Sequence, residues 1–143
     1  MAYRRVSHSL YDLKYHAVFC TKYRYRILTG SVASRTRELI REICATNYVD
    51  IVSGSLSPDH THLLISVPPS MSLSKIVQYI KGKSSRKLLQ EFDHLKKRYW
   101  GQHLWARGYF AVTVGNVNTE DVQRYIENQE EHHQKDDFKI SEF

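Results

Sequence analysis

The sequence predicts an α+β protein with a ferredoxin-like split β-α-β sandwich, in which an antiparallel sheet carries helices on one face, plus a C-terminal tyrosine-bearing helix. Strand-like and helix-like segments follow one another in the order β-α-β-β-α-β-α, which gives two split β-α-β units and a final helix. The 143 residues are 41% hydrophobic and 25% charged, as in an ordinary globular domain. No internal repeat or low-complexity linker divides the chain.

The first three strands and the first helix are expected before residue 70. Residues 13–23, "LKYHAVFCTKY", alternate and are rich in aromatic residues, so they predict a strand. Residues 31–48 carry apolar side chains at helical spacing, namely Val32, Leu39, Ile40 and Ile43. Residues 49–57 and 60–68 predict two further strands, joined by the turn residues Ser57, Pro58 and Asp59.

The second half is expected to supply two helices around a last strand. Residues 72–92 predict a helix with Ser72 as its N-cap and one apolar stripe, formed by Leu73, Ile76, Val77 and Ile80. Residues 104–115 predict one or two short strands that end at Gly115. Residues 119–134 predict the final helix, capped by Asn118 or Thr119.

The net charge of +6 is unevenly distributed along the chain. Residues 1–41 and residues 70–110 each contain nine Lys and Arg against two Asp and Glu, whereas residues 120–143 contain three against eight. Two basic segments suit a polyanionic partner such as nucleic acid. Charge alone leaves open an ordinary basic protein that binds no nucleic acid.

Composition also bounds the compartment. The longest apolar runs, such as "LLI" and "AVFC", are far shorter than the roughly 20 residues of a membrane span. The segment "MAYRRVSHSLYDLKYH" has no apolar signal-peptide region, so a cytoplasmic location is expected. Cys20 and Cys44 lie in apolar contexts without a CxxC spacing, which favours reduced, buried thiols.

The stretch "PDHTHLLISVPP" contains two histidines separated by Thr61. On a strand, His60 and His62 share one face at a spacing of roughly 6.5 Å, so their imidazoles are able to bind one metal ion. Two ligands are incomplete and need a third protein group from another element. The alternative is a pair of partly exposed, hydrogen-bonded histidines at the start of a strand, and for an isolated HxH this alternative is the more common one.

The final helix offers candidates for the missing groups. Tyr125 and Gln129 are four residues apart and share a helical face. A phenolate oxygen is a competent nucleophile at phosphorus, and an amide oxygen suits Mg²⁺ or Mn²⁺. A packed tyrosine and a solvated glutamine are the ordinary alternatives.

The chain resembles the single-tyrosine HUH transposases of small bacterial insertion sequences, the TnpA-type, IS200-like family. Five segments in the same order carry the resemblance: "YHAVFCTKYRYRIL", "PDHTHLLISVPP", "SKIVQYIKGKSSRKL", "LWARGYFAVTVG" and "VQRYIENQ". Together they span nearly all of residues 1–143, which are expected to form a single HUH transposase domain. The middle residue of the histidine pair is usually bulky and apolar in this family, and here it is Thr61, which is expected to point to the opposite face of the sheet.

The resemblance implies both site and substrate. It implies that His60, His62 and Gln129 bind a divalent metal ion, Mg²⁺ or Mn²⁺, and that Tyr125 is the nucleophile. It also implies a homodimer that acts on single-stranded DNA at element ends carrying imperfect hairpins. Tyr125 is then expected to attack a phosphodiester, forming a 5′-phosphotyrosine and a free 3′-hydroxyl. No ATP is needed, and no Walker-type loop occurs in the sequence.

DNA contact is expected at two basic segments, "KYRYR" and "KGKSSRKL". Tyrosine rings suit stacking on bases, and the cations suit phosphates. The candidate residues are Lys22, Tyr23, Arg24, Arg26, Lys81, Lys83, Arg86 and Lys87. Gly115 is a candidate hinge ahead of the tyrosine helix, with an ordinary turn glycine as the alternative.

Two other functions remain open at this point. One is a module that binds single-stranded nucleic acid without catalysis. The other is a domesticated relative that cuts repeated hairpins and mobilises no element of its own.

Overall fold

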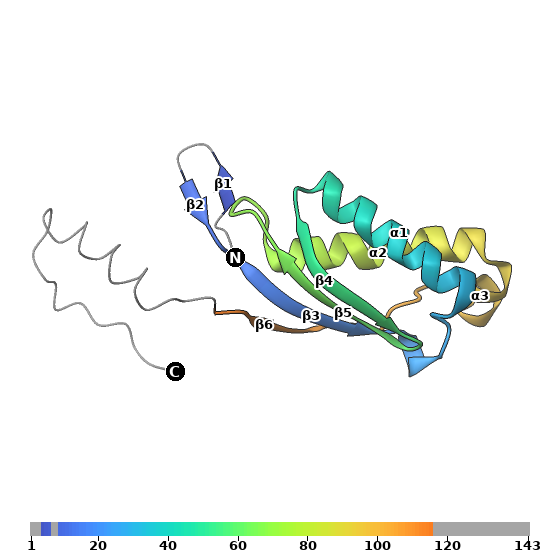
Figure 1. Cartoon of the computed structure of the whole chain (residues 1–143). Helices are drawn as coiled ribbons and strands as arrows, with labels where there is room; N and C mark the ends of the chain where they lie inside the picture. The colour runs from blue at the N-terminus through green and yellow to red at the C-terminus, as the bar shows by residue number, and fades with distance from the viewer. Residues whose placement is uncertain (1–3, 7–8, 116–143) are drawn as a thin grey trace, which may run out of the picture.

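A four-stranded antiparallel sheet with helices packed on one face forms the centre of the structure, a computed structural model that describes residues 4–6 and 9–115 (Figure 1). The strand order is β4-β5-β3-β6. The strands are β3 (Lys14–Cys20), β4 (Asp50–Ser57), β5 (His60–Ser66) and β6 (Phe110–Thr113). The helices are α1 (Gly30–Thr46), α2 (Leu73–Glu91) and the short α3 (Asp93–Arg98).

This strand order confirms the predicted ferredoxin-like fold. In the unit β3-α1-β4, strand β5 lies between the two strands, and in the unit β5-α2-β6, strand β3 does so. The two strands of each unit therefore have one strand of the other unit between them, and both long helices lie on the same face of the sheet. The expected final helix, with Tyr125 and Gln129, lies outside the described residues.

Three elements differ from the expectation. A small hairpin of β1 (Arg4–Val6) and β2 (Ser9–Tyr11) precedes the sheet, and its three-residue strands are too short to produce a recognisable alternation. The 3-10 turn η1 (Lys22–Arg24) ends the first predicted strand early. The short helix α3 follows α2 where no element was expected. Residues 104–115 form one strand, β6, as the expectation of one or two short strands allows, and Trp105 makes an isolated bridge to Thr21 and is buried.

Alternation along the strands divides the sheet into a covered and an open face. Ala17 and Phe19 of β3 and Leu63 and Ile65 of β5 are almost completely buried against the helices. They belong to one hydrophobic core with the inward stripes of α1 and α2, including Leu39, Ile40, Ile76, Val77 and Ile80. The intervening residues of both strands point away from this core, to the face that no helix of the described residues covers. In Figure 1 both long helices lie on the other side of the sheet.

The start of α2 is fixed by a side-chain cap. Ser72 Oγ accepts a hydrogen bond from Lys75 N at 3.1 Å, which confirms it as the N-cap of α2.

Cys20 and Cys44 are both free, and burial raises the pKa of the Cys44 thiol to about 12. None of the helices in the described part of the chain has the length and apolar character needed to span a membrane.

A bidentate ion pair connects the two long helices. Arg35 Nε and Nη2 of α1 lie 2.8 and 3.0 Å from the two carboxylate oxygens of Glu91, at the end of α2. The Arg35 guanidinium holds the pKa of the Glu91 carboxyl below its ordinary value of 4.5. Because the folded-state pKa is lowered, the stabilisation is present above the ordinary pKa and is lost as the pH falls through the folded-state value.

We expect Glu91→Gln to lower the thermal midpoint slightly at pH 7, and the difference from wild type to shrink as the pH falls below the ordinary carboxyl pKa toward the lowered one. The effect is small because exposed pairs contribute little. Thermal denaturation followed by circular dichroism at pH 7 and at pH 3.5 measures both differences. An equal difference at the two pH values would contradict this assignment.

Candidate functional site

His60 and His62 lie on the open face of the sheet, at the end of β5 where the chain leaves the β4–β5 turn. In the register of β3 with β5, His60 is opposite Cys20 and His62 is opposite Val18. Thr61, between them, is fully buried on the helical side, where its Oγ1 donates to Ser55 O at 3.1 Å. The prediction that the two histidines share one face and Thr61 the other is confirmed.

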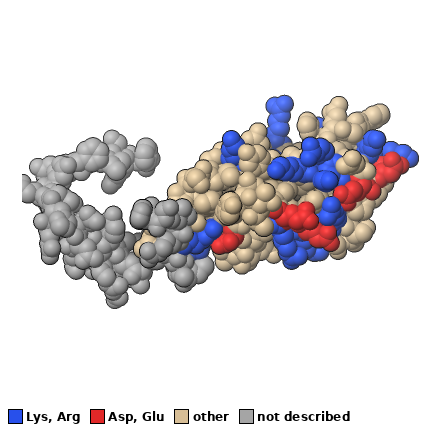
Figure 2. Space-filling model, turned by 90° about the horizontal axis from the view of Figure 1, so that it is seen from above, with Lys and Arg blue, Asp and Glu red and all other residues tan. Residues whose placement is uncertain are grey.

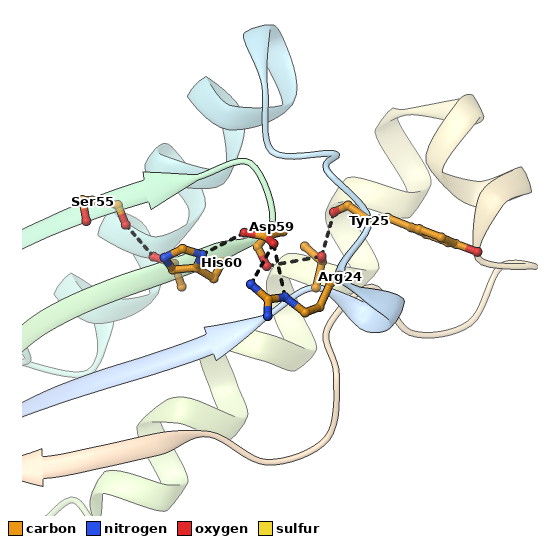
Figure 3. A network of polar contacts seen from close by, with 7 residues as sticks. Arg24, Tyr25, Ser55, Asp59 and His60 are labelled. Atoms are coloured by element: carbon orange, nitrogen blue, oxygen red, sulfur yellow. Dashed lines mark hydrogen bonds and ion pairs between the residues drawn. The ribbon is translucent and has the colours of Figure 1, made fainter.

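His60 is held by the acidic residue beside it in the turn. Its Nδ1 lies 2.8 Å from Asp59 Oδ1, and Asp59 Oδ2 accepts hydrogen bonds from Arg24 Nε and Nη2 at 3.2 and 3.1 Å (Figure 3). The hydrogen bond to His60, and then the Arg24 guanidinium, hold the pKa of the Asp59 carboxyl below its ordinary value. A carboxylate bound to Nδ1 fixes the ring and leaves Nε2 free, the arrangement common among metal-binding histidines.

The turn around Asp59 is itself tied to the end of β3. Thr21 N donates to Asp59 O at 2.9 Å, and Thr21 Oγ1 donates to Tyr25 O at 2.7 Å (Figure 3). Leu28 N donates to Pro58 O at 2.9 Å. The Pro58–Asp59 turn is therefore anchored to residues 21–28, so its position relative to β3 is fixed.

His62 has a different partner, which the sequence analysis did not single out. Its Nε2 lies 2.8 Å from Nδ1 of His16 on β3, with the ring centroids 4.9 Å apart. His16 is opposite Leu64 in the register, so it is a diagonal neighbour of His62 on the same face. Alternation within "KYHAVFC" placed His16 on one face of a strand, but only the strand pairing brings it to His62.

The donors present suit a divalent metal only in part. Imidazole nitrogens suit Fe, Ni, Cu and Zn, whereas Mg²⁺ and Mn²⁺ favour oxygen ligands. The exposed position of His62 leaves room for solvent and substrate oxygens. Within residues 4–6 and 9–115, no three His, Cys, Asp or Glu side chains converge on one point as a metal centre requires. The expected further ligand, Gln129, and the expected nucleophile, Tyr125, lie outside the described residues.

A basic cavity of about 1080 Å³ lies beside α2 at the same end of the sheet. Ala106, which lines it, donates through its backbone N–H to Cys20 O, and Cys20 is the strand partner of His60. Its cationic lining consists of Lys22, Lys81, Arg86, Lys96 and Arg107. No Asp or Glu of the described residues lines it, so the cavity suits an anionic ligand.

The structure distributes the eight expected DNA-binding residues over several environments. Lys22, Lys81 and Arg86 line the cavity, whereas the others do not. Tyr23 is 69% exposed, and its ring lies 5.5 Å from that of Tyr25. Arg24 forms an ion pair with Asp59. Lys83 Nζ lies 5.1 Å from the Tyr79 ring centroid. Arg26 and Lys87 are exposed.

Lys81 makes contacts within the protein that its sequence context does not reveal. Its ammonium donates to Ala106 O and Gly108 O, both at 2.7 Å, and thereby holds the segment that leads to β6. Burial lowers the pKa of this lysine. Lys96 and Arg107 were not among the predicted DNA-binding residues. Lys96 belongs to a basic run, residues 96–98, outside the predicted elements, and Arg107 is an isolated cation.

The surface over the helices carries charges of both signs. Figure 2 looks down on the helical layer and shows Lys and Arg side chains next to Asp and Glu side chains. The Arg35–Glu91 and Arg35–Glu38 ion pairs belong to this mixed surface. The helical layer therefore offers no continuous basic surface, in contrast to the lining of the cavity.

Gly115 is exposed, and a Cβ added there would meet no atom within 4 Å. The described geometry does not itself require glycine at this position. Its role as a hinge stays a prediction.

Comparison with known proteins gives a consistent family. The family described as "Transposase IS200 like" matches residues 9–129. The chain is 36% identical to the ISDra2 transposase TnpA of Deinococcus radiodurans over 120 residues, which cover 84% of this chain and 86% of that protein. It is 38% identical to the transposase for insertion sequence element IS200 of Salmonella typhimurium over 126 residues, 88% of this chain and 82% of that one.

Solved structures agree. A crystal structure of a putative transposase from Deinococcus radiodurans superposes with a TM-score of 0.72 at 34% identity, covering 88% of this chain and 97% of that one. A REP-associated tyrosine transposase bound to a REP hairpin shares the fold, with a TM-score of 0.54 at 16% identity over 92% of this chain and 74% of that one. From the matched residues, the identities and the shared fold, we conclude that this chain belongs to the IS200-like transposase family of DNA-processing enzymes.

Proposed function

We propose that the protein is a metal-dependent endonuclease and strand transferase for single-stranded DNA at the ends of an insertion sequence. The observation that carries the proposal is the His60–His62 pair on the open face, with His60 oriented by Asp59 at 2.8 Å, in a chain of this family. The hairpin bound by the REP-associated relative supports hairpin-bearing DNA as the substrate here.

In the proposed reaction, the chain supplies the nucleophile and orients the scissile phosphate. The Tyr125 oxygen attacks phosphorus and forms a phosphotyrosine bond, while the bond to the 3′-oxygen breaks and that oxygen leaves as a hydroxyl. His60, His62 and Gln129 would hold the divalent ion, Mg²⁺ or Mn²⁺, which supplies charge neutralisation at the phosphate. A later attack by a 3′-hydroxyl on the phosphotyrosine releases Tyr125 and rejoins the strands without ATP.

Asp59 of the β4–β5 turn and Arg24 of η1 would prepare the site before DNA binds. Asp59 holds the His60 ring through Nδ1, so that Nε2 is presented to the open face. Arg24 neutralises Asp59 and restrains it. A homodimer, in which the tyrosine helix of one subunit serves the histidines of the other, and a cytoplasmic location belong to the same proposal.

The direct test is incubation of a labelled single-stranded element end with the protein and Mg²⁺, followed by denaturing electrophoresis. A covalent protein–DNA band that forms with metal and is absent with chelator is the expected result. A non-catalytic binding module would shift the DNA in a native gel and give no covalent band under any condition. A domesticated relative would share the chemistry, so the genomic neighbourhood distinguishes it.

If DNA phosphates bind in the basic cavity, removing a cation from its lining should reduce the salt dependence of DNA binding. We expect Arg107→Ala and Arg86→Ala each to weaken binding of single-stranded DNA and to reduce the slope of log K against log salt by about 0.7, the contribution of one phosphate contact. Both side chains line the cavity and are exposed. Fluorescence anisotropy between 50 and 300 mM salt measures the slope.

The matched control is Arg37→Ala. Arg37 is an exposed cation of α1 outside this cavity. It should leave the slope unchanged. Equal slopes for all three variants and wild type would exclude the cavity as the DNA site.

A further inference from the structure

The two histidines of the candidate site are in different hydrogen-bonding states. His60 uses Nδ1 to bind Asp59, and this leaves Nε2 free. His62 uses Nε2, the nitrogen at the outer end of its ring, to bind Nδ1 of His16 at 2.8 Å. His60 is therefore arranged as metal-binding histidines usually are, whereas the outer nitrogen of His62 already has a partner.

His16 and His62 are well placed to hold one another. They come from the adjacent strands β3 and β5, and their rings are tilted by 43° with centroids 4.9 Å apart. Within the described residues, neither ring makes another side-chain hydrogen bond. His62 is exposed on an open face, so this bond is what restrains its ring.

We propose that His16 is a positioning residue that holds His62 in a metal-free arrangement and has to release its Nε2 before that nitrogen can bind a divalent ion. The inference rests on the proposed function of the histidine pair. Its physical basis is that each imidazole nitrogen either carries a proton or offers one lone pair. A nitrogen engaged with His16, as donor or as acceptor, cannot bind a metal ion at the same time.

The geometry of the described residues favours release of His62 by His16 over a metal centre made of three imidazoles. If His16 joined His60 and His62 on one ion, their donor atoms would have to face a common point. No three such side chains do so in the part of the chain that the structure describes. His16 therefore competes with the ion for His62.

This competition should produce a measurable difference in metal affinity. A hydrogen bond between neutral groups contributes modestly to stability, so removing this competitor should strengthen metal binding by about two- to tenfold. His16→Phe keeps a ring of similar size between Leu64 and Val112, the strand partners of His16, and removes its nitrogens. The variant thus deletes the bond while retaining the packing.

The experiment is titration of the full chain with Mn²⁺ at one fixed pH, with free Mn²⁺ measured by electron paramagnetic resonance. We expect His16→Phe to bind Mn²⁺ two- to tenfold more tightly than wild type, and His62→Ala to lose the site. The matched control is His94→Phe on α3, an exposed histidine that packs beside Phe92, and its affinity should equal that of wild type. Unchanged or weaker binding by His16→Phe would overturn the proposal.

A second measurement uses only the wild-type protein, so it decides the question even if the variant fails to fold. Nitrogen-15 spectra of the histidine rings should show a scalar coupling across the hydrogen bond between His16 and His62 in metal-free protein. Addition of diamagnetic Zn²⁺ should remove it. Absence of the coupling, or its persistence with metal bound, would refute the inference.

These outcomes separate the inference from the proposed function. If wild type forms the covalent DNA adduct and His62→Ala loses Mn²⁺ binding, the metal site stands whatever His16→Phe does. If wild type has no Mn²⁺ site that depends on His62, both the metal site and the release step fail.

Discussion

Tyr125→Phe is expected to abolish the covalent protein–DNA adduct while binding of single-stranded DNA stays within about twofold of wild type. Phenylalanine retains the aromatic ring and its packing but lacks the oxygen that would attack phosphorus. Loss of a covalent nucleophile typically lowers turnover by about 10⁴-fold or more. Denaturing electrophoresis measures the adduct, and anisotropy with the same oligonucleotide measures binding.

A matched variant excludes a general effect of removing a phenol. Tyr48→Phe changes a tyrosine that is 78% exposed between α1 and β4 and is no part of the candidate site. Adduct formation should be unaffected. If Tyr125→Phe still formed the adduct, another residue would be the nucleophile, and the single-tyrosine mechanism would be wrong for this chain.

Replacement of His62 by alanine is expected to reduce cleavage in Mg²⁺ by about 10²- to 10⁴-fold. A metal ion at a reacting phosphate supplies several kcal/mol of charge stabilisation, which corresponds to rate factors of this size. His62 is exposed, and within the described residues its side chain is hydrogen-bonded to His16 alone, so alanine should leave the fold intact. Circular dichroism checks the fold, and timed cleavage of a labelled strand gives the rate.

Metal dependence provides the control for this variant. Wild-type activity should vanish in chelator and return with Mg²⁺ or Mn²⁺, while His62→Ala should respond little to either ion. His94→Ala, an equivalent substitution on the exposed surface of α3, should behave as wild type. Wild-type cleavage that persists in chelator would show that the histidines have another role.

Local patterns in the sequence determined the elements and much of their orientation. The two-residue period of β5 placed His60 and His62 on one face and Thr61 on the other, because successive side chains of a strand point in opposite directions. Ser72 marked the start of α2, since its hydroxyl satisfies a free N–H group there. The order of the elements then fixed the split β-α-β fold. The roles of Tyr125 and Gln129 came from family resemblance and stay predictions.

Only the tertiary structure decided which distant residues meet. His16 reaches His62 because β3 pairs with β5 in one particular register, and Arg24 reaches Asp59 because the turn after β3 lies against the β4–β5 turn. The basic cavity likewise joins α2 to residues 101–107 and to Lys22. Periodicity describes the neighbours of a residue along one element, whereas register and crossover set its neighbours across the sheet. The face that carries the histidines could therefore be predicted from the sequence, but the partner of each histidine depended on how the strands pair.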